Sequence, residues 1–186
     1  QDWGFNFVRL GAMWPGVGKF DVQLQRLTFR THSGVLQHVY IRELKNLVDR
    51  LGSYGIVTLL DFHQDLLSEY FCGEGMPDWA VFVDNSTFTF PGPIVPLTFD
   101  RDPQGKCIHD NENNLKGHPN LSECLTLNFA LYYSSAQVSN AFQALYDNKD
   151  GIQEKFKQFW LILADRFKND TNLIGYEIIN EPVSNH

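Results

Sequence analysis

Polar side chains follow three apolar stretches of the sequence, at the points where those stretches end. Arg9 lies near the end of the first stretch, and Asn180 and Glu181 follow the third. The second stretch is followed by Asp61, His63 and Asp65. If the stretches are buried parallel strands, these groups meet at the carboxyl edge of a sheet, where α/β proteins place their chemistry. Carboxyl and imidazole groups gathered there are suited to general acid–base catalysis.

Each of these residues also has a structural explanation. Arg9 could pair with a nearby carboxylate and lock two strand ends together. Asp61 and Asp65 could cap helices. His63 could be a hydrogen-bonded core histidine, and Glu181 could belong to a turn. However, buried strands rarely carry such groups unless they are paired or functional, and three strands ending in the same way favour one shared site.

The elements that would position these residues alternate between strands and helices. Short apolar runs predict strands at 5–10, 56–60 and 173–179. Apolar residues at helical spacing predict helices at 36–51, 128–146 and 152–167. A loop rich in Gly and Pro is expected at 12–20. Nearly continuous apolar strands joined by helices predict a parallel sheet of the α/β class.

The length favours a single domain over residues 1–186. Within it, the segment 84–125 carries five prolines and little periodicity, which predicts a long loop insertion. Loops of that length in compact domains are often functional.

Charge and hydrophobicity exclude several classes of partner. The 15 Lys and Arg residues against 22 Asp and Glu give a net charge of −7, and no basic cluster is present. This balance argues against binding to nucleic acid and against charge-driven docking on an anionic membrane. No uncharged apolar stretch reaches about 18 residues, so we expect no membrane span.

Known motifs for phosphates, dinucleotides and metals are absent from the sequence. There is no Walker loop, no GxGxxG and no GxSxG, and the His and Cys residues lack the spacing of zinc ligands. The segment 146–157 lacks the key ligands of a calcium loop. We therefore expect neither a metal nor a cofactor.

The cysteines and glycosylation sequons indicate an oxidising compartment. Cys107 and Cys124 enclose a polar loop, so we predict a disulfide between them and a free thiol at Cys72. Sequons of the Asn-x-Ser/Thr type occur at Asn85, Asn120 and Asn169. Together these features favour a secreted or lysosomal glycoprotein. The alternative is a reducing compartment with three inert thiols.

Four segments of the chain resemble one family of enzymes. They are GFNFVRLGAMWPGV (4–17), LLDFHQDLLSEYFCGEGMPDWAV (59–81), DGIQEKFKQFW (150–160) and GYEIINEP (175–182). Together they are similar to endoglycoceramidases, which are retaining β-glycosidases of glycoside hydrolase family 5 with a (β/α)₈ barrel. The block at 59–81 is the most specific, and only the loop at 84–125 has no counterpart.

The resemblance implies a role for each candidate residue. Glu181 would be the general acid/base, and Asn180 would hydrogen-bond the sugar 2-hydroxyl. Arg9 would support the nucleophile electrostatically. The subsite for the sugar next to the cleaved bond would be lined by Asp61, His63 and Asp65. The implied substrate is a glycosphingolipid, cleaved between oligosaccharide and ceramide, with transient contact to a lipid surface.

The resemblance also implies that the chain is a fragment. A complete barrel needs about 250 residues and eight strands, whereas three are predicted, so we expect strands two to four. The nucleophile would lie on a later strand, and the fragment alone would be inactive. Two alternatives remain open. One is a related β-glycosidase acting on steryl glucosides or β-glucans, and the other is a non-catalytic fragment that binds carbohydrate or lipid.

Overall fold

The protein is described here by a computed structural model, which divides into two compact units. The described residues are 3–17, 19–21, 26–28, 38–83, 118–119, 121–125 and 128–183. The first unit, here called the sheet unit, comprises Gln1–His63 and Gln153–Asn180. The second, the loop unit, comprises Gln64–Ile152 and Glu181–His186. The single domain with a loop insertion at 84–125 stays a prediction, because most of that loop lies outside the described residues.

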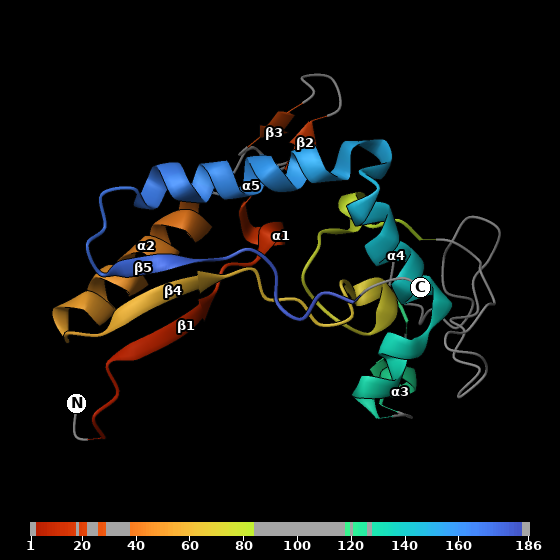
Figure 1. Cartoon of the computed structure of the whole chain (residues 1–186), viewed down its shortest axis with the longest axis horizontal. Helices are drawn as coiled ribbons and strands as arrows, with labels where there is room; N and C mark the ends of the chain where they lie inside the picture. The colour runs from red at the N-terminus through yellow and green to blue at the C-terminus, as the bar shows by residue number, and fades with distance from the viewer. Residues whose placement is uncertain are drawn as a thin grey trace. The chain divides into compact units, whose positions relative to one another are not determined.

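Three parallel strands form the sheet of the sheet unit. They are β1 (Phe7–Gly11), β4 (Val57–Asp61) and β5 (Leu173–Glu177), in the order β1-β4-β5 (Figure 1). Each lies within two residues of a predicted strand. In the register, Gly11 pairs with Asp61 and Asp61 with Glu177. The three strands therefore end level with one another, at a single edge of the sheet.

The two long helices of the sheet unit connect these strands. Helix α2 (His38–Ser53) joins β1 to β4, α5 (Ile152–Phe167) precedes β5, and both lie on the same side of the sheet (Figure 1). A doubly wound sheet has helices on both sides, whereas a (β/α)₈ barrel has its helices on the outside only. Successive parallel neighbours with both helices on one side confirm the predicted α/β class and are the arrangement expected for part of a barrel.

Short elements occupy the segment between β1 and α2, where a loop was predicted. Helix α1 spans Trp14–Val17, and an antiparallel pair is formed by β2 (Lys19–Asp21) and β3 (Arg26–Thr28). Trp14 and Val17 are fully buried. Pro15 is tolerated because N–H groups in the first turn have no acceptor within the helix. Burial of two side chains, and not helical propensity, explains why this turn forms.

An aromatic cluster packs the sheet against α5. Phe62 and Phe159 are fully buried, with ring centroids 5.7 Å apart, and Phe62 lies 4.9 Å from the ring of Phe156. Aromatic pairs in tilted and edge-to-face geometry contribute about 0.5–1.5 kcal/mol beyond their area burial. Because Phe62 directly follows the last residue of β4, this packing fixes the chain where it leaves the sheet.

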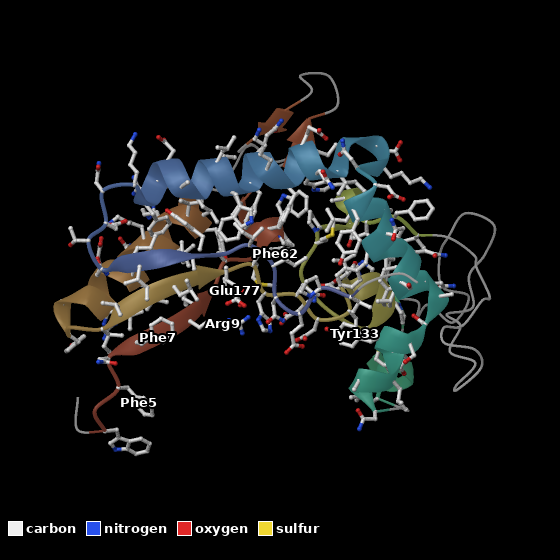
Figure 2. The ribbon with its side chains drawn as sticks, in the orientation of Figure 1. Phe5, Phe7, Arg9, Phe62, Tyr133 and Glu177 are labelled. Carbon is white, nitrogen blue, oxygen red and sulfur yellow. A yellow bond between two sulfur atoms is a disulfide. The ribbon has the colours of Figure 1, made fainter. Side chains whose placement is uncertain are left out.

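The side of the sheet away from the helices carries exposed aromatic residues. Phe5 is 70% exposed and Phe7 is 44% exposed, and both point away from the helices (Figure 2). Residues two apart on a strand share a face. The side chain of Arg9 therefore lies on the same helix-free side as Phe7.

The end of α2 is tied to the turn that precedes β5. Asn172 Nδ2 donates to the Val48 carbonyl at 2.6 Å, and Lys45 Nζ lies 2.8 Å from Asp170 Oδ1. A Cβ atom at Gly52 would lie 2.6 Å from Asn172 Nδ2. Glycine at this position therefore makes room for the amide that donates to the Val48 carbonyl.

The loop unit contains short helices, four of them of the 3₁₀ type (η). They are η1 (Glu69–Phe71), η2 (Asp78–Ala80), α3 (Leu121–Cys124), η3 (Phe129–Ser134), α4 (Ala136–Tyr146) and η4 (Lys149–Gly151). The helix predicted over 128–146 is divided at Ser135, whose Oγ accepts a hydrogen bond from Val138 N at 3.3 Å. A serine N-cap of this kind starts a new helix. No helix in the described ranges has the length and apolar character needed to cross a membrane.

The predicted pairing of the cysteines is wrong. Cys72 is bonded to Cys124, with a Cα–Cα distance of 5.4 Å, so Cys72 is not a free thiol. Cys107, the partner predicted for Cys124, lies outside the described residues. The prediction favoured the shorter loop, yet closure entropy rises only slowly with loop length and does not oppose a separation of 52 residues. In the entropic model a loop of that size contributes about 4 kcal/mol.

Candidate functional site

The ends of the three parallel strands carry a cluster of charged and polar side chains. We call it the strand-end cluster, and it consists of Arg9, Asp61, His63, Glu177 and Asn180. The level strand ends place Asp61 opposite Glu177 on neighbouring strands. Two carboxylates in directly opposed positions repel each other. A cation between them is therefore required for this register.

Arg9 supplies that cation and contacts three members of the cluster. Its Nε donates to Glu177 Oε2 at 2.6 Å, and its Nη2 donates to Glu177 Oε1 at 2.9 Å (Figure 2). The same Nη2 lies 3.1 Å from Asp61 Oδ2 and donates to Asn180 Oδ1. The two parallel bonds to Glu177 form the bidentate pair that guanidinium and carboxylate groups prefer. Arg9 thus joins the ends of all three strands.

Asp61 is the buried member of the cluster. Its side chain is only 2% exposed, and among the described residues its Oδ1 atom has no hydrogen-bond partner. Burial raises the pKa of Asp61 above its ordinary value; the His63 hydrogen bond and the Arg9 charge lower it, and the Glu177 carboxylate raises it. Desolvation of the charged form is the dominant cause.

His63 and Asn180 have their orientations set by the charged residues. His63 Nδ1 donates to Asp61 Oδ2 at 3.0 Å, which leaves Nε2 as the acceptor nitrogen of the neutral ring. Asn180 is buried, and its backbone N–H donates to the Phe62 carbonyl at 3.2 Å. Its side-chain oxygen faces Arg9, so its amide nitrogen faces away from the guanidinium.

The loop unit holds a second group of candidate residues. We call it the loop cluster, and it consists of Gln64, Asp65, Tyr133 and Glu181. The Tyr133 hydroxyl accepts a hydrogen bond from Leu66 N at 3.1 Å and donates to Asp65 Oδ1 at 3.3 Å. Burial raises the pKa of Tyr133, and the charges of Asp65 and Glu181 raise it further. Tyr133 therefore stays protonated and can donate at neutral pH.

Backbone pairing fixes the position of Asp65. Asp65 N donates to the Glu74 carbonyl at 3.0 Å, and Glu74 N donates to the Asp65 carbonyl at 2.7 Å. A Cβ atom at Gly73 would come within 1.8 Å of that Asp65 carbonyl oxygen. Gly73 is thus required for the two segments to approach, which explains the first glycine of the Gly-Glu-Gly sequence at 73–75.

The backbone at Glu181 has an unusual conformation. Glu181 has a φ of 40°, in the left-handed region that non-glycine residues rarely adopt, and it precedes Pro182. The fully buried Gln64 donates from Nε2 to the Glu181 carbonyl at 3.2 Å, which holds this conformation. The Glu181 side chain is exposed to solvent. Strained backbone of this kind is concentrated at functional sites.

The structure brings the predicted residues into two groups. Arg9, Asp61, His63 and Asn180 contact one another in the sheet unit, and Asp65 and Glu181 belong to the loop unit. The functional roles implied for them stay predictions. Three further residues were missed: Glu177, Gln64 and Tyr133. A charged residue within an apolar strand was a usable signal for Glu177, whereas nothing in the local sequence singles out Tyr133.

One group of side chains in the loop unit could in principle hold a metal ion. Glu69, Asp78 and His118 offer ligand atoms within 4.8 Å of one another. However, His118 Nδ1 lies 3.0 Å from Glu69 Oε2, and His118 Nε2 lies 3.0 Å from Asp78 Oδ1. A single ion cannot bind both ring nitrogens of one histidine. The geometry is that of an imidazole ring bridging two carboxylates.

Comparison with known proteins identifies relatives of the chain. Residues 132–186 match the family model described as Cellulase (glycosyl hydrolase family 5). The endoglycoceramidase of Hydra vulgaris is 37% identical over 98% of this chain, and that of Cyanea nozakii is 36% identical over 98%. The chain spans 30% and 31% of those relatives, respectively.

A solved structure shows the same fold. The endo-glycoceramidase II of Rhodococcus sp., in its ganglioside GM3 complex, superposes with a TM-score of 0.61 at 22% identity. The match covers 97% of this chain and 33% of that one. The chain is thus homologous to endoglycoceramidases over nearly its whole length, and its three parallel strands form part of an α/β barrel.

Proposed function

We propose that the full-length protein is a retaining β-glycosidase that hydrolyses the bond between oligosaccharide and ceramide in glycosphingolipids. The observation that carries the proposal is the sequence Asn180-Glu181-Pro182, which begins three residues after the end of β5 and whose Asn180 belongs to the strand-end cluster around Arg9. The names of the Hydra and Cyanea relatives and the ganglioside in the Rhodococcus structure support this choice of substrate.

Glu181 is the proposed acid/base. Its exposed carboxyl group can protonate the oxygen of the departing ceramide and later take a proton from the attacking water. Retention requires a second carboxylate about 5–5.5 Å away as nucleophile. We place this nucleophile on a later strand of the full-length protein, as the resemblance to endoglycoceramidases implies.

The other candidate residues are proposed to bind the sugar next to the cleaved bond. The Asn180 amide can donate to a hydroxyl group, and the Nε2 atom of His63 can accept from one. Arg9 places a positive charge beside Asp61 and Glu177. Asp61 orients His63 and Asp65 accepts from Tyr133, so both carboxylates act within hydrogen-bonded networks.

The test is an assay of the full-length protein on three substrates: a glycosylceramide, a steryl glucoside and a cello-oligosaccharide. We expect release of intact oligosaccharide and ceramide from the first, with the other two cleaved much more slowly. Faster cleavage of the steryl glucoside or cello-oligosaccharide would assign another activity of the same clan. Binding of the glycolipid without turnover would indicate a carbohydrate- or lipid-binding protein.

We further propose that the protein is a secreted or luminal glycoprotein that contacts lipid surfaces transiently. The disulfide between Cys72 and Cys124 is of the kind that persists in oxidising compartments. Asn169 begins a sequon and is exposed in the turn between α5 and β5. Treatment of the protein from secreting cells with an amidase that removes N-glycans should lower its mass, and Asn169→Gln should remove part of that shift.

A further inference from the structure

We propose that Glu177 is a positioning residue that fixes the direction of the Asn180 carboxamide by holding Arg9. The inference rests on the proposed function for the identity of what Asn180 binds, a sugar hydroxyl. Glu177 itself need not touch the sugar. It acts through the chain of contacts that runs from β5 to β1 and then to Asn180.

The first step in this chain is the bidentate pair. Glu177 accepts from Arg9 Nε at 2.6 Å and from Arg9 Nη2 at 2.9 Å. Two parallel bonds fix the plane of the guanidinium as well as its position. Arg9 is 37% exposed at its side chain and could otherwise occupy several rotamers. Glu177 is therefore what selects the one that reaches Asn180.

The second step is the contact between Arg9 and Asn180. Arg9 Nη2 donates to Asn180 Oδ1, and an arginine has no acceptor atom. The oxygen of the carboxamide must therefore face Arg9, and the nitrogen must face away from it. In this direction the N–H donors of Asn180 point away from Arg9, and under the proposed function they donate to the sugar hydroxyl. With the guanidinium displaced, nothing in this pair prevents the amide from turning over and presenting its oxygen.

Asp61 cannot replace Glu177 in this role. It meets Arg9 through a single Oδ2 atom at 3.1 Å, and that atom also accepts from His63. One shared contact does not define the plane of the guanidinium. Without Glu177 we expect Arg9 to turn toward Asp61, whose buried carboxylate needs a counter-ion, and to leave Asn180.

The experiment uses the full-length protein and two aryl β-lactosides, one of which lacks the 2-hydroxyl on the sugar that bears the aryl group. Glu177→Gln should lower kcat/KM about 10- to 100-fold on the complete substrate, the loss expected when a hydrogen bond to the reacting sugar is removed. On the 2-deoxy substrate the same variant should lose less than about threefold. In an Asn180→Ala background, Glu177→Gln should have little further effect on either substrate.

Two variants serve as controls. Arg9→Lys keeps the charge and loses the bidentate geometry, so it should reproduce the substrate pattern of Glu177→Gln. Glu154→Gln, at an exposed position in the first turn of α5, should change neither substrate. Equal losses on both substrates, or additive losses with Asn180→Ala, would show that Glu177 acts independently of Asn180 and overturn the inference. A parent protein that cleaves neither substrate would instead overturn the proposed function, and this inference with it.

Discussion

The strand-end cluster and the loop cluster are stabilised in different ways. In the sheet unit, regular strands in register bring Arg9, Asp61 and Glu177 together, and the ion pairs between them complete the arrangement. In the loop unit, Glu181 and Asp65 lie on irregular backbone that is held by single hydrogen bonds, a short bridge and a disulfide. The first depends on strand pairing and charge, and the second depends on local backbone geometry.

This difference separates binding from chemistry in the proposed mechanism. The sheet unit contributes most of the residues proposed to bind the sugar, and the relative positions of their side chains must be fixed; Asp65, the remaining one, belongs to the loop unit. The loop unit contributes the acid/base, which sits on a strained residue with a φ of 40°. The two groups meet in the chain at the peptide bond between Asn180 and Glu181. Substitutions in the two clusters should therefore have different signatures.

The largest effect is expected for Glu181→Ala in the full-length protein. Loss of the acid/base should lower the rate about 10²- to 10⁴-fold on a substrate with a poor leaving group. A substrate with an activated leaving group needs no protonation and should lose less in its first step. Added azide should restore turnover by replacing the water that Glu181 would activate. Normal activity of the variant on the glycolipid would remove Glu181 from this role.

The next largest effect is expected when the disulfide of the loop unit is removed. Removing the bridge by Cys72→Ser with Cys124→Ser should destabilise the loop unit by up to about 4 kcal/mol. Hydrogen exchange should accelerate in peptides from 64–83 and 128–152, with little change in peptides from 38–60. Equal acceleration of exchange in both units would show that the disulfide does not stabilise the loop unit in particular.

A smaller effect is expected when the ionic support of the sheet unit is removed. Arg9→Leu leaves the carboxylates of Asp61 and Glu177 opposite each other without a cation. We expect a loss of about 2–3 kcal/mol, below the range for fully buried pairs because Arg9 is partly exposed. Denaturant unfolding of the full-length variant measures it. The companion variant Glu177→Leu with Arg9→Leu should recover part of the loss, since it removes the repulsion.

The smallest effect is expected in the pH dependence of the free energy of unfolding. The folded-state pKa of Asp61 is raised above its ordinary value of 3.8, so the folded protein binds a proton more readily than the unfolded chain. The stability that this group contributes is present at low pH and is lost as pH rises through the raised pKa. The free energy of unfolding of the parent, minus that of Asp61→Asn, should therefore fall over the pH interval that begins near the ordinary value of 3.8 and extends above it. A difference that rises over this interval would mean that Arg9 outweighs burial.

The sheet unit was the more predictable part of the molecule. Continuous apolar runs predicted β4 and β5 to within two residues, because a run of consecutive apolar residues is typical of a strand that is covered on both faces. The parallel direction of the strands was predicted with them, and it placed Arg9, Asp61 and Asn180 at one edge, because parallel strands have their carboxyl ends on the same side. Glu177 was missed because its position within an apolar run made it part of the predicted strand, and its partner Arg9 lies 168 positions away in the sequence.

The loop unit was less predictable for a physical reason. The contact of Tyr133 with Asp65 and the pairing of Cys72 with Cys124 join residues that are more than fifty positions apart, and no periodicity reports such contacts. Three cysteines allow three pairings, and spacing alone does not rank them. The split of 128–146 at Ser135 is a local signal that could have been used, because serine is a preferred N-cap.

The close approach of Asn172 to Gly52 has a consequence for how this sequence can vary. Any side chain at position 52 would occupy the space of the Asn172 amide, and any loss of that amide would remove its hydrogen bond to the Val48 carbonyl. The two positions lie 120 residues apart, yet a change at one should be accepted only with a change at the other. We therefore expect relatives of this protein to replace Gly52 and Asn172 together, and chimaeras that exchange only one of them to fold poorly.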